Sequence, residues 1–249
     1  EVVIVSAVRT PVGSFNGGLA SKTAPQLGAI AIKEAINRAG IKPEDVSEVI
    51  MGCVLTAGLG QAPARQAAIF AGLPNSVPCL TIGKVCGSGL KAVMLGAQAI
   101  QCGDADVVVA GGMESMSNVP YYLDKARNGY RMGDGKVIDG MIKDGLWDVY
   151  NNFHMGNAAE MCSREMNITR EMQDDFAEES YKRALAATEN GAFKDEIVPV
   201  EITDKKGTVT ISEDEDIRKG NAEKGRKLKP SFEKEGTITA FNASSINDG

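Results

Sequence analysis

The first 116 residues alternate short apolar runs with longer helix-like segments, and this alternation restricts the folds open to the chain. Apolar runs rich in β-branched residues predict strands at 2–8, 46–54, 79–82 and 106–110. Helical spacing of apolar residues predicts helices at 24–39, 64–71 and 88–102, each followed by glycine. Strands that alternate with helices indicate βαβ units, and hence an α/β fold with a mostly parallel sheet covered by helices.

The pattern changes near residue 117. Residues 117–153 are rich in Gly, Asp, Asn and Tyr and carry little periodicity. Two helices follow, one with a capping box at Asn157–Glu160 and one that starts after Thr169 and runs to about Asn190. An apolar stripe marks the second helix, at Met172, Phe176, Tyr181 and Leu185. Two short strands are expected within 197–211, a charged surface stretch over 212–236 and a strand at 237–241.

These segments predict three parts. Residues 1–116 form the first part of an α/β domain, residues 117–236 form one long α+β insertion, and residues 237–249 return to the first domain as a strand.

Composition excludes several classes of protein. With 27 basic and 33 acidic residues the net charge is −6, which argues against a nucleic-acid binder. No apolar run approaches the length of about 20 residues that a membrane span needs. The five cysteines include no C-x-x-C pair, and the chain has one histidine, so neither a disulfide scaffold nor a zinc site is expected. Reduced thiols in a cytoplasmic protein are the simplest interpretation.

One cysteine has a distinctive setting. Cys86 lies in a glycine-rich turn, residues 85–89, between a predicted strand and a predicted helix. A helix N-terminus commonly lowers a thiol pKa from about 8.5 to about 3.5–7.5, and the thiolate is the nucleophilic form. Gly87 and Gly89 permit a sharp turn that exposes the sulfur, and the Cys86 N–H is a candidate oxyanion donor. The alternative is a small buried hydrophobe, the role assigned to Cys53, Cys79, Cys102 and Cys162.

Five segments resemble the thiolase family, in the same order. The segment TIGKVCGSGLKAV around Cys86 is similar to the one that carries the acylated cysteine of thiolases. The others are SAVRTPVGSFNGGLA (6–20), GGMESMS (111–117), HMGNAAE (154–160) and KEGTITAFNASSINDG (234–249). One departure is Gly83, where many thiolases carry Asn. The resemblance covers essentially the full chain and implies a thiolase-like fold.

The resemblance implies a function. Thiolases make or cleave 3-ketoacyl-CoA by Claisen chemistry, through an acyl-cysteine that Cys86 would form, with coenzyme A thioesters as substrates and neither a permanent cofactor nor a metal. The His-Met-Gly form of residues 154–156 resembles short-chain enzymes, which favours acetyl-CoA and acetoacetyl-CoA. Thiolases are homo-oligomers, commonly tetramers of paired dimers, and the same is expected here, with no membrane or nucleic-acid partner.

The insertion resembles the thiolase loop domain, which binds coenzyme A. Seven residues fall where the family contacts it, namely Leu146, His154, Met155, Arg218, Phe232, Ala240 and Ser244. Arg218 would face the adenosine phosphates and Ser244 the pantetheine amides. The alternatives are a solvated charge for Arg218, core packing for Met155 and Phe232, and a structural hydrogen bond for His154.

Thiolases carry further catalytic residues in a second half, and the chain has no counterpart of them. These are a histidine in a Gly-His-Pro motif, a second cysteine and an oxyanion-hole asparagine. We therefore expect the chain to be the N-terminal portion of such an enzyme, with the C-terminal half absent and little activity on its own. The alternatives are a non-catalytic CoA-binding or structural module, a thiolase of broader chain length or a ketoacyl synthase. A nicotinamide dehydrogenase is disfavoured because Gly58 and Gly60 lack the third fingerprint glycine.

Overall fold

The computed structural model describes all residues, 1–249, and its centre is a three-stranded parallel sheet. Strand β2 (Glu48–Gly52) lies between β3 (Cys79–Ile82) and β4 (Val108–Gly112). Val49 pairs with Cys79 on one side and with Val109 on the other. The predicted parallel βαβ arrangement is therefore confirmed, although β4 lies two residues later than expected.

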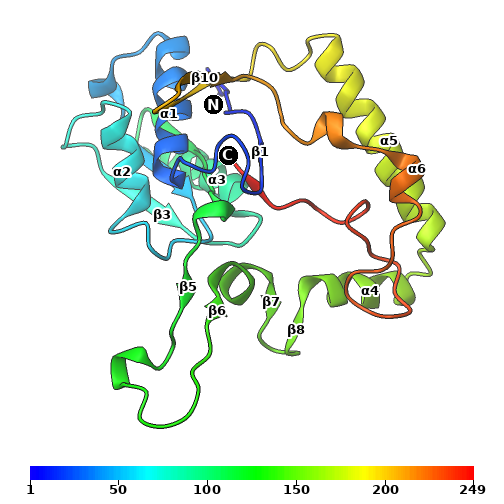
Figure 1. Ribbon diagram of the computed structural model, residues 1–249. Coiled ribbons are helices and arrows are strands. Elements are labelled where there is room, and N and C mark those ends of the chain that lie inside the picture. The colour runs from blue at the N-terminus through cyan, green and yellow to red at the C-terminus, as the bar shows by residue number, and fades with distance from the viewer.

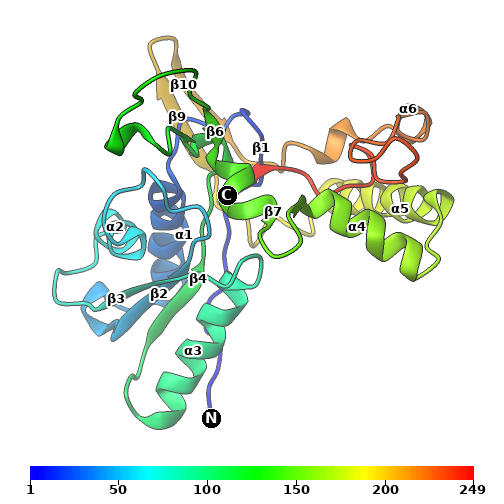
Figure 2. The ribbon, with the colours of Figure 1, turned by 90° about the horizontal axis from the view of Figure 1, so that it is seen from below.

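Helices cover both faces of this sheet (Figure 2). Helices α1 (Ala24–Ala39) and α2 (Pro63–Phe70) pack on the face that carries Val49 and Met51, where the main core cluster lies. Helix α3 (Ser88–Cys102) packs on the opposite face, against β2 and β4. The predicted helix at 24–39 ends at Gly40, which has the left-handed φ of +68° that glycine adopts without steric cost.

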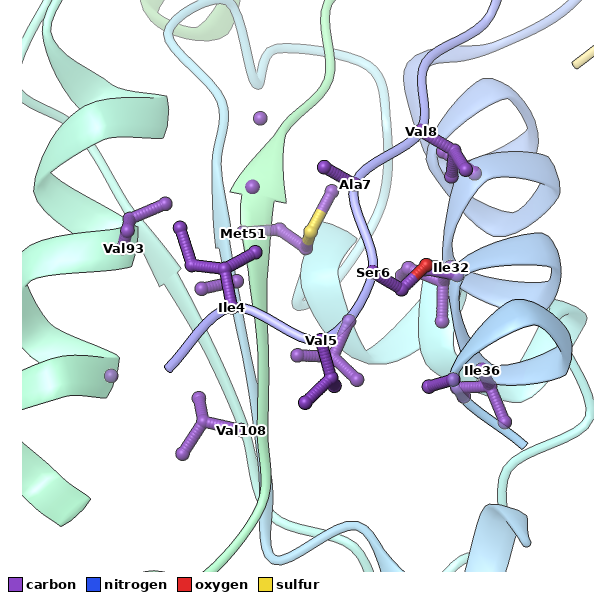
Figure 3. A pocket seen from close by; sticks show the side chains of 18 of the residues that line it. Ile4, Val5, Ser6, Ala7, Val8, Ile32, Ile36, Met51, Val93 and Val108 are labelled. Carbon is purple, nitrogen blue, oxygen red and sulfur yellow. The ribbon is translucent and has the colours of Figure 1, made fainter. Parts of the chain in front are cut away.

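The predicted strand at 2–8 is wrong. Residues 2–8 form no strand and pair with none, and the first sheet-type bond is at Arg9, whose N–H donates to Glu196 O at 2.9 Å. Ile4 and Val5 line an apolar cavity of about 690 Å³ together with Val93 and Val108 (Figure 3). The composition suits a strand, but the ion pairs of Arg9 hold the end of the segment to the insertion instead.

Within the insertion, helices α4 (Met155–Glu165), α5 (Arg170–Glu189) and α6 (Ala222–Gly225) form an arm beside the sheet domain (Figure 1), whereas Val200 in the later hairpin packs with Leu19 and Leu27 of the sheet domain. Two antiparallel pairs come first, β5 (Tyr121–Tyr122) with β6 (Ile138–Asp139) and β7 (Trp147–Asp148) with β8 (Phe153–His154). Helices α4 and α5 follow. The two strands expected within 197–211 form a hairpin of β9 (Val200–Asp204) and β10 (Gly207–Ile211).

Short elements complete the chain. The helix α6 spans Ala222–Gly225, and β1 (Gly13–Ser14) pairs antiparallel with β11 (Asn247–Asp248). Single helical turns lie at Pro43–Asp45, Met116–Asn118, Ala126–Asn128, Ile142–Leu146 and Ile217–Lys219. None of the helices combines the length and the apolar character needed to cross a bilayer.

Two local predictions for the arm helices are corrected. The capping box at Asn157–Glu160 does not form, because α4 begins at Met155 and His154 caps it. The apolar stripe of α5 packs inward only in part, since Met172 and Phe176 are exposed while Tyr181 stacks on the buried Phe241. Thr169 does cap α5, accepting from the Met172 N–H at 3.2 Å.

Two further predictions fail at the C-terminal end. Residues 237–241 form no strand, and their backbone bonds to a glutamate side chain instead of a neighbouring strand. The charged stretch at 212–236 is not all surface. Asp214, Glu215 and Asp216 are half-buried and accept from the loop at residues 12–18.

Candidate active site

Cys86 lies on an exposed turn between the end of β3 and the start of α3, as the sequence predicts. The turn is closed by backbone bonds from Gly87 N–H to Lys84 O and from Ser88 N–H to Val85 O, both at 3.1 Å. Val85 has a φ of +46°, which β-branched residues rarely adopt. The chain therefore folds here into a tight strand-to-helix turn with the cysteine near its apex.

The backbone N–H of Cys86 donates to no acceptor within the chain. It lies just ahead of the first turn of α3, where N–H groups lack partners inside the helix. A free donor adjacent to an exposed thiol is the arrangement that stabilises an oxyanion formed at a carbonyl under attack by that thiol.

Glycines let this helix start approach the sheet closely. A Cβ on Gly52, at the end of β2, would lie 2.6 Å from the Cβ of Ser88. A Cβ on Gly112, at the end of β4, would lie 3.3 Å from the Gly89 Cα. The ends of two strands therefore support the first turn of α3 directly behind Cys86.

The other cysteines differ from Cys86 in their surroundings. Cys53 is buried, and burial together with the nearby Glu114 carboxylate raises the pKa of its thiol to about 12. Burial also raises the pKa of the Cys79 thiol. The packing role predicted for these two is confirmed, whereas Cys102 and Cys162 are exposed and do not belong to a core.

Glu114 is a structural residue of the site that the sequence pattern does not single out. It follows β4, and its carboxylate accepts from the N–H groups of Val54 at 2.9 Å and Leu55 at 3.1 Å. It thereby fixes the loop after β2 at the same edge of the sheet as the cysteine turn. Its place in the segment GGMESMS, directly after a strand, was the available signal.

His154 and Phe232 form the centre of the second group of predicted site residues. Their rings stack with centroids 4.9 Å apart and an interplanar angle of 22°. His154 Nδ1 accepts from the Gly156 N–H at 2.9 Å, and burial lowers the pKa of the imidazole. The neutral ring therefore carries its proton on Nε2, which is left as a donor.

Gly156 makes this stacking possible. A Cβ at this position would lie 2.3 Å from the Phe232 ring. Asn157 Nδ2 donates to Phe232 O at 3.4 Å, which ties the same residue to α4 from the backbone side. Met155, next to His154, has 41% of its surface exposed and is not a core residue.

The remaining predicted residues lie around the arm without bonds to that pair. Arg218 forms an exposed ion pair with Glu213 at 3.1 Å. Leu146 ends the helical turn at Ile142–Leu146 and is half-buried, and Ala240 and Ser244 are exposed. The structure thus brings His154 and Phe232 together, with Met155 next to His154 in the chain, and it leaves Arg218, Ala240 and Ser244 accessible on other segments.

Glu160 holds the C-terminal segment against α4. It is 1% exposed, and its carboxylate accepts from the N–H groups of Thr237 and Ile238, each at 2.8 Å. Burial would raise the pKa of this carboxyl, but these bonds and that of the Thr237 hydroxyl hold the pKa below its usual value. The segment that carries Ala240 and Ser244 is thereby anchored to the helix that His154 caps.

Comparison with known proteins identifies relatives over the whole chain. A family profile described as "Thiolase, N-terminal domain" matches residues 2–249. An acetyl-CoA acetyltransferase of Cupriavidus necator is 60% identical over 251 residues, which cover 100% of this chain and 64% of the relative. Acetyl-CoA acetyltransferase 2 of Arabidopsis thaliana is 57% identical, with 100% and 62% covered. A cytosolic acetyl-CoA acetyltransferase of Gibberella zeae is 54% identical, with 100% and 63% covered. The chain therefore spans less than two thirds of the length of these relatives.

Proposed function

Because the chain belongs to the thiolase family, we propose that it acts as the N-terminal portion of an acyltransferase that makes or cleaves acetoacetyl-CoA. The observation that carries this proposal is the exposed Cys86 thiol on a tight strand-to-helix turn, with its own N–H free beside it. The names of the similar proteins support the substrate class, since they are acetyl-CoA acetyltransferases.

The proposed reaction has two halves, as cysteine nucleophiles allow. The Cys86 thiolate attacks the thioester carbonyl of acetyl-CoA, the carbon–sulfur bond to coenzyme A breaks, and the coenzyme leaves as a thiol after taking up a proton. A second acetyl-CoA then loses a proton from its α-carbon. The resulting carbanion attacks the acetyl carbonyl, a carbon–carbon bond forms, and Cys86 leaves as thiolate. Cleavage of acetoacetyl-CoA is the reverse.

We propose that Cys86 N–H donates to the oxyanion in both halves. The donor is preorganised, because it makes no bond that must break before it can act. A base for the α-proton is not assigned among the residues of the chain. The one histidine, His154, is committed through Nδ1 to the cap of α4, and its ring stacks on Phe232.

The arm is the proposed binding site for coenzyme A. His154 offers its Nε2–H as a donor, while Leu146, Met155 and Phe232 offer apolar contact. Arg218 would take the adenosine phosphates, since its exposed pair with Glu213 is of the kind that contributes little and exchanges readily. Ser244 and Ala240 would contact the pantetheine from the segment that Glu160 anchors. No permanent cofactor is proposed.

We also propose that the protein is a cytoplasmic homotetramer. The hairpin of β5 and β6 projects from the body of the molecule (Figure 1). It exposes apolar side chains that self-association would cover, among them Tyr121, Leu123, Met132 and Val137. The cytosolic relative in Gibberella zeae supports the location.

The test is CoA-dependent cleavage of acetoacetyl-CoA by the protein encoded in the complete reading frame. The variant Cys86→Ser should lose at least about 10³-fold in turnover, and Cys102→Ser, at another exposed thiol, should match the wild type. Longer 3-ketoacyl-CoA substrates measured in parallel separate a short-chain enzyme from one of broader range. An inactive wild-type protein that still binds CoA would favour the binding-module alternative.

A further inference from the structure

The residue before the nucleophile is held in a conformation that its own side chain disfavours. Val85 has a φ of +46°, in the left-handed region where a β-branched residue is strained. Its side chain does not compensate by packing, because 58% of the residue is exposed. Something else in the turn must therefore hold Val85 in place.

Ser88 supplies the two contacts that bracket Val85. Its hydroxyl accepts from the Lys84 N–H at 2.8 Å and donates to Val85 O at 2.6 Å. Ser88 is 4% exposed and packs directly on Gly52 at the end of β2. The hydroxyl that spans the strained residue is thus anchored to the sheet.

This hydroxyl does not serve as an ordinary helix cap. A capping serine accepts from an N–H group of the first helical turn. The cap position of α3 is Gly87, which makes no such bond, and the Ser88 hydroxyl bonds backward to residues 84 and 85. Its two bonds add to the backbone bonds that close the turn presenting Cys86, and neither belongs to the hydrogen bonds of the helix.

We propose that Ser88 is a positioning residue for Cys86, which holds Val85 in the left-handed conformation and so keeps the thiol exposed and its N–H free. The inference rests on the proposed role of Cys86 as nucleophile. Ser88 acts through the backbone and touches neither substrate nor sulfur. Without the hydroxyl, Val85 would relax to a negative φ, and the peptide that carries the Cys86 N–H would rotate with it.

The experiment measures the rate of alkylation by iodoacetamide at each cysteine, by peptide mass spectrometry at neutral pH. The variants are Ser88→Ala, Val85→Asn and the double variant, because asparagine tolerates the left-handed region far better than valine. Ser47→Ala is the matched control. The Ser47 hydroxyl also bonds to backbone N–H groups, at Asp106 and Val107, but at the opposite end of the sheet.

We expect Ser88→Ala to slow alkylation of Cys86 about tenfold, with Cys102 and Cys162 unchanged. Val85→Asn and Ser47→Ala should react like the wild type. The double variant should recover most of the lost rate, which a merely structural role of Ser88 would not produce. An unchanged rate in Ser88→Ala, or no recovery in the double variant, overturns the proposal.

The outcomes also separate this inference from the proposed function. If wild-type Cys86 reacts no faster than Cys102, the nucleophile itself is refuted. If Ser88→Ala unfolds, the buried Cys53 becomes labelled and reports it. In that case the Cys86 alkylation rate of Val85→Asn is compared with that of the double variant. Equal rates support the proposal, and a slower rate in the double variant contradicts it.

Discussion

At the scale of single residues, the site depends on backbone groups as much as on side chains. The position of Cys86 in a strand-to-helix turn follows from its glycine-rich surroundings, and the structure confirms it. The contribution of Ser88 could not be predicted, because a serine after glycine at a helix start looks like a cap. Only the three-dimensional turn shows that its hydroxyl faces residues 84 and 85.

The titration of the His154 imidazole can be predicted from its surroundings. Burial lowers the pKa of its imidazole, so the folded chain takes up this proton less readily than the unfolded chain. Stability is therefore unaffected above pH about 6.5 and declines as the pH falls from there toward the folded-state pKa. Because the chain has one histidine, its ring resonances in a proton–carbon NMR spectrum are unambiguous. Their midpoint should lie below 6.5, and a midpoint at or above that value contradicts the half-buried, neutral cap.

At the scale of elements, most of the sheet domain follows from periodicity and glycine stops. The helices at 24–39 and 88–102 and the strand at 79–82 have the predicted bounds. The strand at 2–8 was mispredicted because a strand needs a partner as well as a composition. The start of α4 was mispredicted because a histidine is an uncommon cap and Glu160 is used elsewhere.

In the arm, the anchoring role of Glu160 can be tested through the stability of the protein. Replacing Glu160 with Gln removes the charge that two backbone N–H groups and a hydroxyl share, so we expect a loss of about 1–3 kcal/mol in the free energy of unfolding. Denaturant titration measures it. Glu235→Gln, two residues before Thr237 and exposed, is the control.

The contribution of Glu160 to the free energy of unfolding should also depend on pH. Since its bonds hold the pKa of Glu160 below the ordinary value, its contribution is present above the unfolded-state pKa of about 4.3 and is lost as the pH falls through the folded-state pKa. Equal stabilities of Glu160→Gln and Glu235→Gln would refute the anchoring role.

At the scale of the whole molecule, an acidic run connects the insertion to the sheet domain. Asp214 accepts from both terminal guanidinium nitrogens of Arg9 and from the Val12 N–H at 2.8 Å. Glu215 accepts from the Ser14 N–H at 2.7 Å. The sequence alone marks this run as solvated surface, because side chains paired across about 200 residues leave no local signal.

The contribution of this acidic run to stability can be tested at Asp214. Asp214→Asn should lower the free energy of unfolding by about 1–3 kcal/mol, because it leaves the half-buried Arg9 with a weaker partner. The neighbouring Glu213→Gln, which affects only the exposed pair with Arg218, should change it by less than about 1 kcal/mol. Both are measured by urea denaturation. Similar effects for the two variants would show that the run is ordinary surface.

If Cys86 accepts the acyl group, an acid-quenched reaction should hold that group on its sulfur. The protein encoded by the complete reading frame is incubated with acetoacetyl-CoA without free coenzyme A, quenched in acid and digested, and each cysteine peptide is weighed. We expect an acetyl group on the peptide that contains Cys86 and on no other cysteine peptide. Turnover with Cys86 unmodified, or acetylation at another cysteine that survives Cys86→Ser, would contradict it.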